Sequence, residues 1–459
     1  MTVLASAIQT VRRVQPMRIV GRVAELRGLT LLAEDLPMPV GTLVRIRGLE
    51  GDVFGEIVGL SRRHAIVMLL GQTTGIRAGD EVVGEQVAQT VGVSHRMLGR
   101  VLDGLGRPID DLGPIADLTP RALNPEPLTP LRRAPIREVL TTGVRALDLM
   151  TTLGRGQRLG IFAGPGVGKS TLMGTIAQRT SADVNVIALI GERGREVKDF
   201  IHHALGPEGL KRSVVIVATG DESPLMRIRA AKAAATIAEF FRDPVGGSRD
   251  VLLMMDSVTR FAHAQRQIGL SVGEPPATKG YTPSVFAQMA LLLERAGSVV
   301  PPPGHAKGGS VTGLYTILVE GDDMTEPVSD AARGILDGHV ILSRKLAQKA
   351  HYPAIDVLDS ISRVADEICE PSHSAARRTL MRALALYREV EDLVQIGAYV
   401  RGNNPESDAA IDFNAQINAL LRQGRGEQEP FDKARAMLQK LAQALAEASA
   451  RNAKARGRA

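Results

Sequence analysis

The sequence predicts an α/β protein in three parts: an N-terminal antiparallel β-barrel, a central domain with a mostly parallel sheet, and a C-terminal helical domain. Three observations support this fold class. The 459 residues suffice for roughly three domains of about 150 residues each. Short β-rich runs give way to apolar runs that alternate with helical stretches, and no strand-like run follows about Glu370. We place the domains at 1–92, 93–369 and 370–459.

The predicted barrel rests on closely spaced β-rich runs between Met17 and Glu85, which are separated by glycines. These runs include 18–23, 43–47, 53–58 and 65–70. Strands at this spacing, with turn residues between them, favour a small antiparallel barrel. Before them, Leu4, Ile8 and Val11 recur at helical spacing. Residues 1–13 are therefore either a short amphipathic helix or a frayed terminus.

The central and C-terminal parts differ in their periodicity. Residues 94–127 are rich in Gly, Pro and Asp and are expected to form a loop. Five apolar runs with β-branched residues then alternate with helical stretches: 159–162, 184–190, 214–217, 251–255 and 314–319. This alternation favours a mostly parallel sheet with helices on both faces. Residues 377–400 and 432–449 are helical by their period.

The composition excludes several classes of protein. No apolar run approaches the ~18 residues of a membrane helix, and the start lacks a signal-peptide core, so we expect a cytoplasmic protein. The single cysteine, Cys369, excludes an internal disulfide framework and a cysteine-based zinc site; we expect it to be a small buried hydrophobe. The net charge of +6 is weak evidence for binding to a polyanion.

A glycine-rich loop at residues 163–171 reads Ala-Gly-Pro-Gly-Val-Gly-Lys-Ser-Thr, between a predicted strand and a helical stretch. Strand, glycine loop and helix in this order are typical of a Walker A phosphate loop, although Ala163 replaces the first motif glycine. The glycines let backbone N–H groups surround phosphates, and the helix N-terminus adds a positive dipole end. We assign nucleotide binding to Gly164, Pro165, Gly166, Val167, Gly168, Lys169, Ser170 and Thr171.

Two of these side chains have expected individual roles. Lys169 is expected to reach the β- and γ-phosphates, and the Ser170 hydroxyl is expected to hold Mg²⁺. The apolar run 251–255 ends in Asp256, which is the arrangement of a Walker B strand. At the carboxyl end of the sheet, Asp256 is expected to belong to the Mg²⁺ shell as well.

Charged residues also follow the predicted strand 184–190. Hydrolysis needs a group that orients or deprotonates water, and we choose Glu192 because it lies closest to the strand end. Arg193 and Arg260 are expected to neutralise charge on the γ-phosphate. Two further charged residues of the segment are interpreted as a surface ion pair: Arg195 and Glu196.

These motifs resemble the catalytic subunits of rotary-type ATPases and, more closely, the flagellum-specific ATPases of the type III export apparatus. The matching stretches are 100–110, 154–164, 190–197, 256–262, 273–286, 351–356 and 360–363. They span roughly residues 100 to 400, with weaker similarity outside. The resemblance implies a RecA-like, F1-type central domain with ATP and Mg²⁺ as cofactors. It also implies hydrolysis of ATP to ADP and phosphate in support of protein export.

The resemblance adds two site residues and an assembly. In the family, the arginine of Ser-Ile-Ser-Arg is a finger to the neighbouring subunit's nucleotide, which implies this role for Arg363. The tyrosine of His-Tyr-Pro stacks on adenine, which implies the same for Tyr352; a half-buried core tyrosine is the alternative. A chain that carries both Glu192 and a finger fits a homo-oligomeric ring, expected to be a hexamer, in which each subunit also serves its neighbour's site.

The resemblance also implies partners. Residues from about 268 to 283 are implied to line the central hole of the ring and to meet a coiled-coil stalk protein. The N-terminal segment is implied to bind a negative regulator that is peripheral to the complex. Export substrates and their chaperones are the remaining partners that the resemblance implies. The protein is then expected at the inner-membrane export apparatus, with at most peripheral membrane contact through the export gate.

Two features of the C-terminal part are expected to be structural. Its apolar stripe is expected to pack inside the domain: Met437, Leu438, Leu441 and Leu445. The basic tail that follows is expected to be a solvated terminus.

Three other functions are alternatives to flagellar export. An injectisome ATPase of type III secretion shares the whole catalytic set, although the stretches 223–229 and 259–270 favour the flagellar group. A hexameric nucleic-acid translocase of the transcription-terminator kind needs a stacking platform. Residues 1–92 contain one aromatic, Phe54, and carry 10 basic against 9 acidic side chains, so no nucleic-acid partner is expected. Glu192 argues against a non-catalytic nucleotide-binding subunit.

Overall fold

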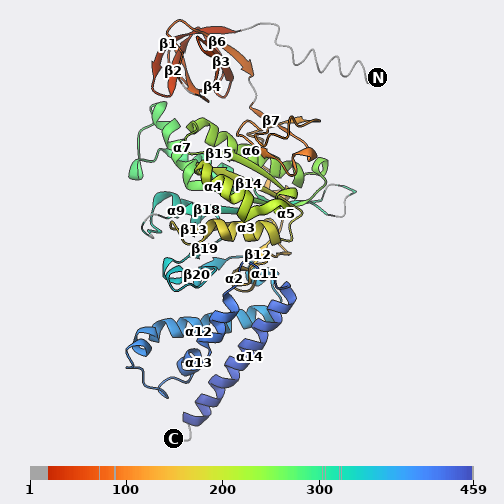
Figure 1. Ribbon diagram of the computed structural model, residues 1–459, viewed down its shortest axis with the longest axis vertical. Coiled ribbons are helices and arrows are strands. Elements are labelled where there is room, and N and C mark those ends of the chain that lie inside the picture. Colours follow the sequence, from red (N-terminus) through yellow and green to blue (C-terminus); the bar gives the residue numbers. More distant parts are fainter. Residues whose placement is uncertain are drawn as a thin grey trace.

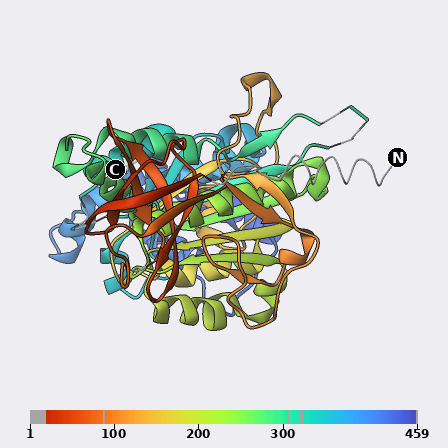
Figure 2. The ribbon, with the colours of Figure 1, turned by 90° about the horizontal axis from the view of Figure 1, so that it is seen from above.

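The computed structural model describes residues 19–71, 73–86, 89–301, 303–304, 307–319, 321 and 323–456. Its barrel, central sheet domain and C-terminal helices follow one another along the long axis of the molecule (Figure 1). Seen from above, the barrel lies in front of the other two parts (Figure 2). The predicted fold class is confirmed. The helix or frayed terminus predicted for residues 1–13 lies outside the described residues.

The barrel contains six antiparallel strands and closes in the order β1-β2-β5-β4-β3-β6. Their bounds are β1 (Val20–Arg27), β2 (Thr30–Glu34), β3 (Leu43–Gly48), β4 (Gly51–Leu60), β5 (His64–Leu69) and β6 (Glu81–Gln86). Alternate side chains point into it, so Val44 and Ile46 are fully buried whereas Arg45 between them pairs with Asp52 at 3.0 Å on the outside. The four predicted runs therefore belong to one closed barrel.

The central sheet has the strand order β20-β19-β13-β18-β16-β14-β15-β8. Its strands are β8 (Val101–Leu102), β13 (Arg158–Ala163), β14 (Val184–Ile190), β15 (Ser213–Ala218), β16 (Asp250–Asp256), β18 (Ser310–Leu318), β19 (Gly338–Leu342) and β20 (Ile355–Ser362). Neighbours in this order are parallel, except that β20 runs antiparallel to β19. The mostly parallel sheet is thus as predicted.

The expected loop at 94–127 is wrong in part, because it contains short strands that pair with distant segments. β8 extends the central sheet beside β15, and β9 (Thr119–Ala122) pairs with β7 (Thr90–Val93). Four more short strands form pairs in this domain: β10 (Arg133–Ala134) with β17 (Gly297–Val299), which also pairs with β18, and β11 (Val139–Leu140) with β12 (Leu153–Gly154). Strands of two to four residues are too short for a hydrophobic period to reveal.

Helices cover both faces of the central sheet. Phe162 and Val186 pack with α6, α7, α8 and α9, whereas Ile161 and Ile187 pack with α3. Successive strand residues face opposite sides, so both faces are apolar and both are covered. The helices are α2 (Arg145–Met150), α3 (Lys169–Arg179), α4 (Gly194–Asp199), the π-helix η3 (Phe200–Leu205), α5 (Gly206–Lys211), α6 (Pro224–Arg242), α7 (Val258–Ser271), α8 (Pro283–Leu293), α9 (Pro327–Ile335) and α10 (Arg344–Gln348). Four 3₁₀ turns connect these elements: η1 (His95–Met97), η2 (Pro130–Arg132), η4 (Pro244–Gly246) and η5 (Thr278–Gly280).

The C-terminal part consists of α11 (Ala365–Ile368), α12 (Pro371–Gln395), α13 (Pro405–Leu421) and α14 (Phe431–Arg456). The helix predicted to reach residue 400 ends five residues earlier, because Gly397 turns the chain with a φ of 73°. Helix α13 was not predicted from the sequence, although Asn404 caps it and Pro405 occupies its first position.

The expected packing of the C-terminal stripe is largely confirmed. Leu438 and Leu445 are buried and Leu441 is packed against the same core, whereas Met437 remains 41% exposed. Cys369 is half-buried, and burial raises the pKa of its thiol. Among the described residues, no helix is both long and apolar enough to cross a bilayer.

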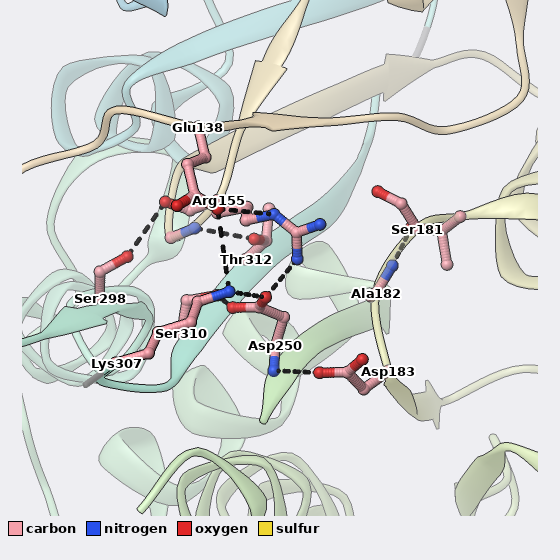
Figure 3. Close-up of polar contacts among 12 residues, drawn as sticks. Glu138, Arg155, Ser181, Ala182, Asp183, Asp250, Ser298, Lys307, Ser310 and Thr312 are labelled. Carbon is pink, nitrogen blue, oxygen red and sulfur yellow. Dashed lines mark hydrogen bonds and ion pairs between the residues drawn. The ribbon is translucent and has the colours of Figure 1, made fainter. Parts of the chain in front are cut away.

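A polar network fastens the edge of the sheet where the parallel strands begin (Figure 3). The carboxylate of Asp250, the first residue of β16, accepts hydrogen bonds from the Lys307 ammonium and the Ser310 hydroxyl, both at 2.7 Å, and pairs with Arg155. Its backbone N–H donates to Asp183 at 2.8 Å. Loops from four parts of the chain are thereby joined at this edge, and the glycine loop lies at the opposite one.

Candidate active site

The glycine loop connects β13 to α3 at the edge where the parallel strands end. Gly166 and Gly168 have φ angles of 78° and 91°, a left-handed conformation that glycine adopts without steric cost. Leu172 and Ile176 on α3 are buried in the core, which fixes the helix with its N-terminus at this edge. The loop amides and the dipole end of α3 therefore form a site suited to phosphate.

Three charged side chains from separate elements converge beside the loop. Lys169 at the start of α3 pairs with Asp256 at the end of β16, and its Nζ lies 3.7 Å from Oε1 of Glu192, which follows β14. The three side chains are only 13%, 6% and 14% exposed, respectively. The Thr316 hydroxyl donates to Oδ1 of Asp256 at 2.7 Å and holds that carboxylate in place. The structure thus brings together three of the residues selected from the sequence.

The environment of Glu192 changes its protonation. Burial is the largest cause, followed by the negative charge of Asp256, and together they raise the pKa of Glu192 to about 7 although Lys169 acts in the opposite direction. The neighbouring Glu196 adds to the increase in pKa, because it accepts a hydrogen bond from the protonated Glu192 carboxyl and repels its charged form. A general base is most effective when its pKa lies near the working pH, so this carboxylate is suited to accept a proton from water.

The two arginines selected for the γ-phosphate lie differently. The side-chain stem of Arg260 packs against Gly191: a Cβ atom built on Gly191 would lie only 2.9 Å from the Cβ of Arg260. Arg260 is therefore next to the loop that carries Glu192. The side chain of Arg193 is 87% exposed and pairs with Glu196 at 3.8 Å. The structure therefore places Arg260, but not the Arg193 guanidinium, against the segment that leads into the site.

Arg195 and Glu196 both take part in surface ion pairs, as interpreted, but not with each other. Glu196 pairs with Arg193, and Arg195 pairs with Asp199 one turn further along α4 at 3.7 Å. In the helix, residues three or four positions apart share a face, whereas adjacent residues do not.

Tyr352 lies beside the glycine loop. Its ring is 3.7 Å from a Cβ built on Gly168, and 47% of the residue is exposed, so it is not a core tyrosine. It lines a cavity of about 370 Å³ with Gly166, Val167 and Thr171 of the loop and helix α3. An aromatic face at a cavity that continues from the phosphate loop is suited to stacking with a base.

A further part of the cavity lining, residues 423–425, was not predicted from the sequence. Arg425 donates to the Thr171 hydroxyl at 2.9 Å, and the backbone N–H of Gln423 donates to the Tyr352 carbonyl at 2.9 Å. Arg145 and Arg179 bind backbone carbonyls of the same segment. No local pattern marks these residues, because Arg425 and Thr171 are 254 positions apart in the sequence.

Arg363 lies at the other edge of the sheet from Lys169. It directly follows β20, whose last residue, Ser362, pairs with Gly338 at the start of β19. The end of β19, Leu342, pairs with Ala163 just before the glycine loop. The two ends of β19, Gly338 and Leu342, are four residues apart, which in a strand is about 13 Å, and the glycine loop extends beyond Leu342. The chain therefore holds Arg363 away from its own glycine loop.

Comparison with known proteins agrees with this geometry. Residues 143–362 match the nucleotide-binding domain of the ATP synthase alpha/beta family, residues 35–85 match its beta-barrel domain, and residues 369–440 match the T3SS EscN ATPase C-terminal domain. Over 423 residues, 92% of each chain, the sequence is 51% identical to the Flagellum-specific ATP synthase of Treponema pallidum (strain Nichols). The chain belongs to the ATP synthase alpha/beta family.

Other members of the ATP synthase alpha/beta family extend the comparison. The Type 3 secretion system ATPase of Xanthomonas euvesicatoria is 48% identical over 405 residues, which cover 88% of this chain and 89% of that protein. A solved structure shows the assembled ATPase EscN in complex with its central stalk EscO, from the type III secretion system of enteropathogenic E. coli. It matches with a TM-score of 0.83 and 38% identity over 92% of this chain and all of that chain.

This member of the ATP synthase alpha/beta family has a donor set that fits a nucleotide-bound Mg²⁺. Ser170 and Asp256 carry oxygen atoms of the hard kind that Mg²⁺ prefers, and Asp256 pairs with Lys169 at the loop. Among the described residues, no group of three or more His, Cys, Asp or Glu could hold a metal ion. Magnesium commonly takes one or two protein oxygens and completes its shell with phosphate and water, so these two residues suffice when a nucleotide supplies the remainder.

Proposed function

We propose that this chain is the Mg-ATP-hydrolysing ATPase of a flagellar type III export apparatus. It acts as a homo-oligomer, expected to be a hexamer, and assists the unloading and export of flagellar proteins. The observation that carries the proposal is the convergence of Lys169, Asp256 and Glu192 at the glycine loop. The 51% identity to a flagellum-specific relative favours the flagellar system.

In the proposed mechanism, the loop amides and Lys169 hold the triphosphate, and Tyr352 stacks on adenine. Ser170 and Asp256 would hold Mg²⁺, which neutralises phosphate charge when it is bound. Glu192 accepts a proton from the attacking water, and Arg260 adds positive charge beside the γ-phosphate. Arg193 has to turn away from Glu196 to do the same.

The transition state is completed by Arg363 of the neighbouring chain. Its position at the edge opposite the glycine loop makes it unable to serve its own site, whereas a guanidinium from the next subunit can approach the phosphates. Such a finger is worth about 10³- to 10⁵-fold in rate in phosphoryl transfer. The assembled state of the EscN relative supports an assembly of this kind.

The experiment that tests this proposal mixes two inactive variants. Lys169→Ala removes the phosphate-binding ammonium, and Arg363→Ala removes the finger. Each is expected to be inactive alone, and their mixture is expected to recover part of the activity, because some interfaces then pair an intact Lys169 with an intact Arg363. Wild-type activity per milligram should rise cooperatively with protein concentration. Activity that is independent of concentration, with no recovery on mixing, contradicts the proposal.

We expect kcat/KM for ATP to fall as the pH is lowered through about 7. Glu192 accepts a proton only as a carboxylate, and its pKa is raised to about 7, so the active fraction declines about tenfold per pH unit below that value. The measurement is kcat/KM from about pH 5.5 to about pH 9. Glu196→Gln is the matched control. It removes a neighbour that raises the pKa of Glu192, so the fall in kcat/KM should occur at lower pH. If the residual activity of Glu192→Gln falls at low pH in the same way as that of the wild type, the titrating group is not Glu192.

An injectisome ATPase is the second candidate function. The 48% identity to the Xanthomonas Type 3 secretion system ATPase supports it, because the difference from the flagellar relative is small. The two candidates share the catalytic residues and differ in the proteins that they export.

The proposed partners follow from the same assignment. EscN is solved with its central stalk EscO, and we propose that residues 268–283, which include an exposed loop after α7, contact a coiled-coil stalk in the ring centre. The N-terminal segment, outside the described residues, is proposed to bind a peripheral regulator. Export substrates and chaperones are the remaining proposed partners. The proposed location is the cytoplasm, at the inner-membrane export apparatus.

A further inference from the structure

A second arginine lies beside the finger. Arg333 is near the end of α9, two residues before the helix stops and five before β19 begins. Val328, Ser329 and Ala332 form the buried face of α9, and Arg333 lies beside this face with its side chain exposed. Arg363 donates from Nη2 to the backbone carbonyl of Arg333 at 3.4 Å. The two arginines therefore stand next to one another at one edge of the sheet.

Both guanidinium groups act on the same imidazole. His339 is half-buried, and burial is the largest cause of its lowered pKa; the positive charges of Arg333 and Arg363 lower it further. The ring also packs edge-on against Phe162 at a centroid distance of 5.8 Å. The imidazole next to the two arginines is therefore neutral. Among the charged neighbours that affect its pKa, only Asp359 raises it.

The guanidinium of Arg333 makes no hydrogen bond or ion pair within the part of the chain that the structure describes. Arg158, near the same edge, differs: it pairs with Asp337 at 2.9 Å and also with Glu294. Two neighbouring arginines without a carboxylate between them repel each other and create a positive field. Planar guanidinium groups in such an arrangement favour a polyanion with several phosphate oxygens.

The backbone that carries the finger is firmly held. The N–H of Arg363 donates to the Asp337 carbonyl at 3.0 Å. The hydroxyl of Ser362 donates to the Thr152 carbonyl at 2.8 Å and accepts from the buried Gln157 at 3.0 Å. Charges that are positioned before the reaction need little reorganisation in the transition state, which makes them effective stabilisers.

We infer that Arg333 is a second cation delivered in trans, which acts with Arg363 on the triphosphate bound by the neighbouring subunit. This inference rests on the proposed function, since it assigns Arg333 to the same shared site. Arg363 stabilises the transferred phosphoryl group, and Arg333 adds charge from the same face of the same subunit. A contact with a carboxylate of the neighbouring chain is the competing role for Arg333.

The first test measures kcat and KM for Arg333→Ala, Arg333→Lys and the control Arg378→Ala, an exposed arginine on α12 without a described partner. Alanine retains the backbone carbonyl that Arg363 binds, so the change removes the guanidinium and its stem but not this contact. We expect kcat to fall about 10²-fold with little change in KM, lysine to restore part of the rate, and the control to match the wild type. A normal kcat for Arg333→Ala overturns the inference. So does a loss that high protein concentration removes, because it indicates an assembly contact.

The second test uses three mixtures. Lys169→Ala with Arg333→Ala should recover activity, because an interface can then combine an intact loop with two intact arginines. Arg333→Ala with Arg363→Ala should recover none, because every interface lacks one of the two; recovery there overturns the inference. Lys169→Ala with Arg363→Ala tests the proposed function itself. Recovery in that mixture, with a normal rate for Arg333→Ala, rejects only the role of Arg333; failure to recover rejects the shared site.

Discussion

Arg363→Ala should lower the ATPase rate by about 10³-fold or more, even at protein concentrations where the wild type is fully assembled. In the proposed mechanism the guanidinium stabilises charge that spreads over the γ-phosphoryl oxygens in the transition state. Steady-state kcat, measured over a series of protein concentrations, reports the loss.

Arg363→Lys provides a stricter test of the same role. Lysine retains the charge but not the planar fork that matches phosphate oxygens, so we expect it to restore only a small part of the rate. Arg378→Ala again controls for the loss of an exposed arginine. A rate for Arg363→Ala within about tenfold of the wild type would remove the finger from the mechanism.

Glu192→Gln should abolish turnover and leave nucleotide binding intact. The amide keeps the size of the side chain but cannot accept a proton from water, so kcat should fall about 10²- to 10⁴-fold. Lys169 and the loop amides remain in place, and the affinity for ATP, measured by calorimetry, should stay within about threefold.

Glu196→Gln is the matched control for this prediction. Its carboxylate is 52% exposed and pairs with Arg193 at the surface, so at a pH above 7 its turnover should be close to that of the wild type. Near-normal hydrolysis by Glu192→Gln would assign the proton acceptor to another group.

The sequence predicted the parts of the site that depend on local order. The glycine loop follows a strand and precedes a helix, and parallel strands that end at one edge bring Asp256 and Glu192 to Lys169. Arg363 and Tyr352 were identified through resemblance, since nothing in their local pattern indicates a role. The direction of the Arg193 side chain depends on its pairing with Glu196, which sequence spacing does not determine.

Other features could not be predicted because they depend on contacts between distant segments. Gln423 and Arg425, from the segment between α13 and α14, line the cavity beside Tyr352. The strands β19 and β20 alternate between buried and partly exposed positions, and β20 in addition pairs antiparallel beside a parallel sheet. Their pattern therefore differs from the continuous apolar runs that revealed β14 and β16.

Lys169 and Arg363 lie at opposite edges of one sheet, so a complete site in the proposed assembly needs the glycine loop of one chain and the arginine of another. The number of complete sites therefore depends on how the chains are arranged. In the proposed assembly each subunit joins the next one head to tail, so that the glycine loop of one chain meets Arg363 of its neighbour. An open row of subunits then has one fewer complete site than it has chains, because one terminal glycine loop meets no arginine. Closing the row supplies the last site without adding a chain. Ring closure itself therefore raises the activity per subunit, and a partner that opens the ring silences one site even if it never touches the nucleotide.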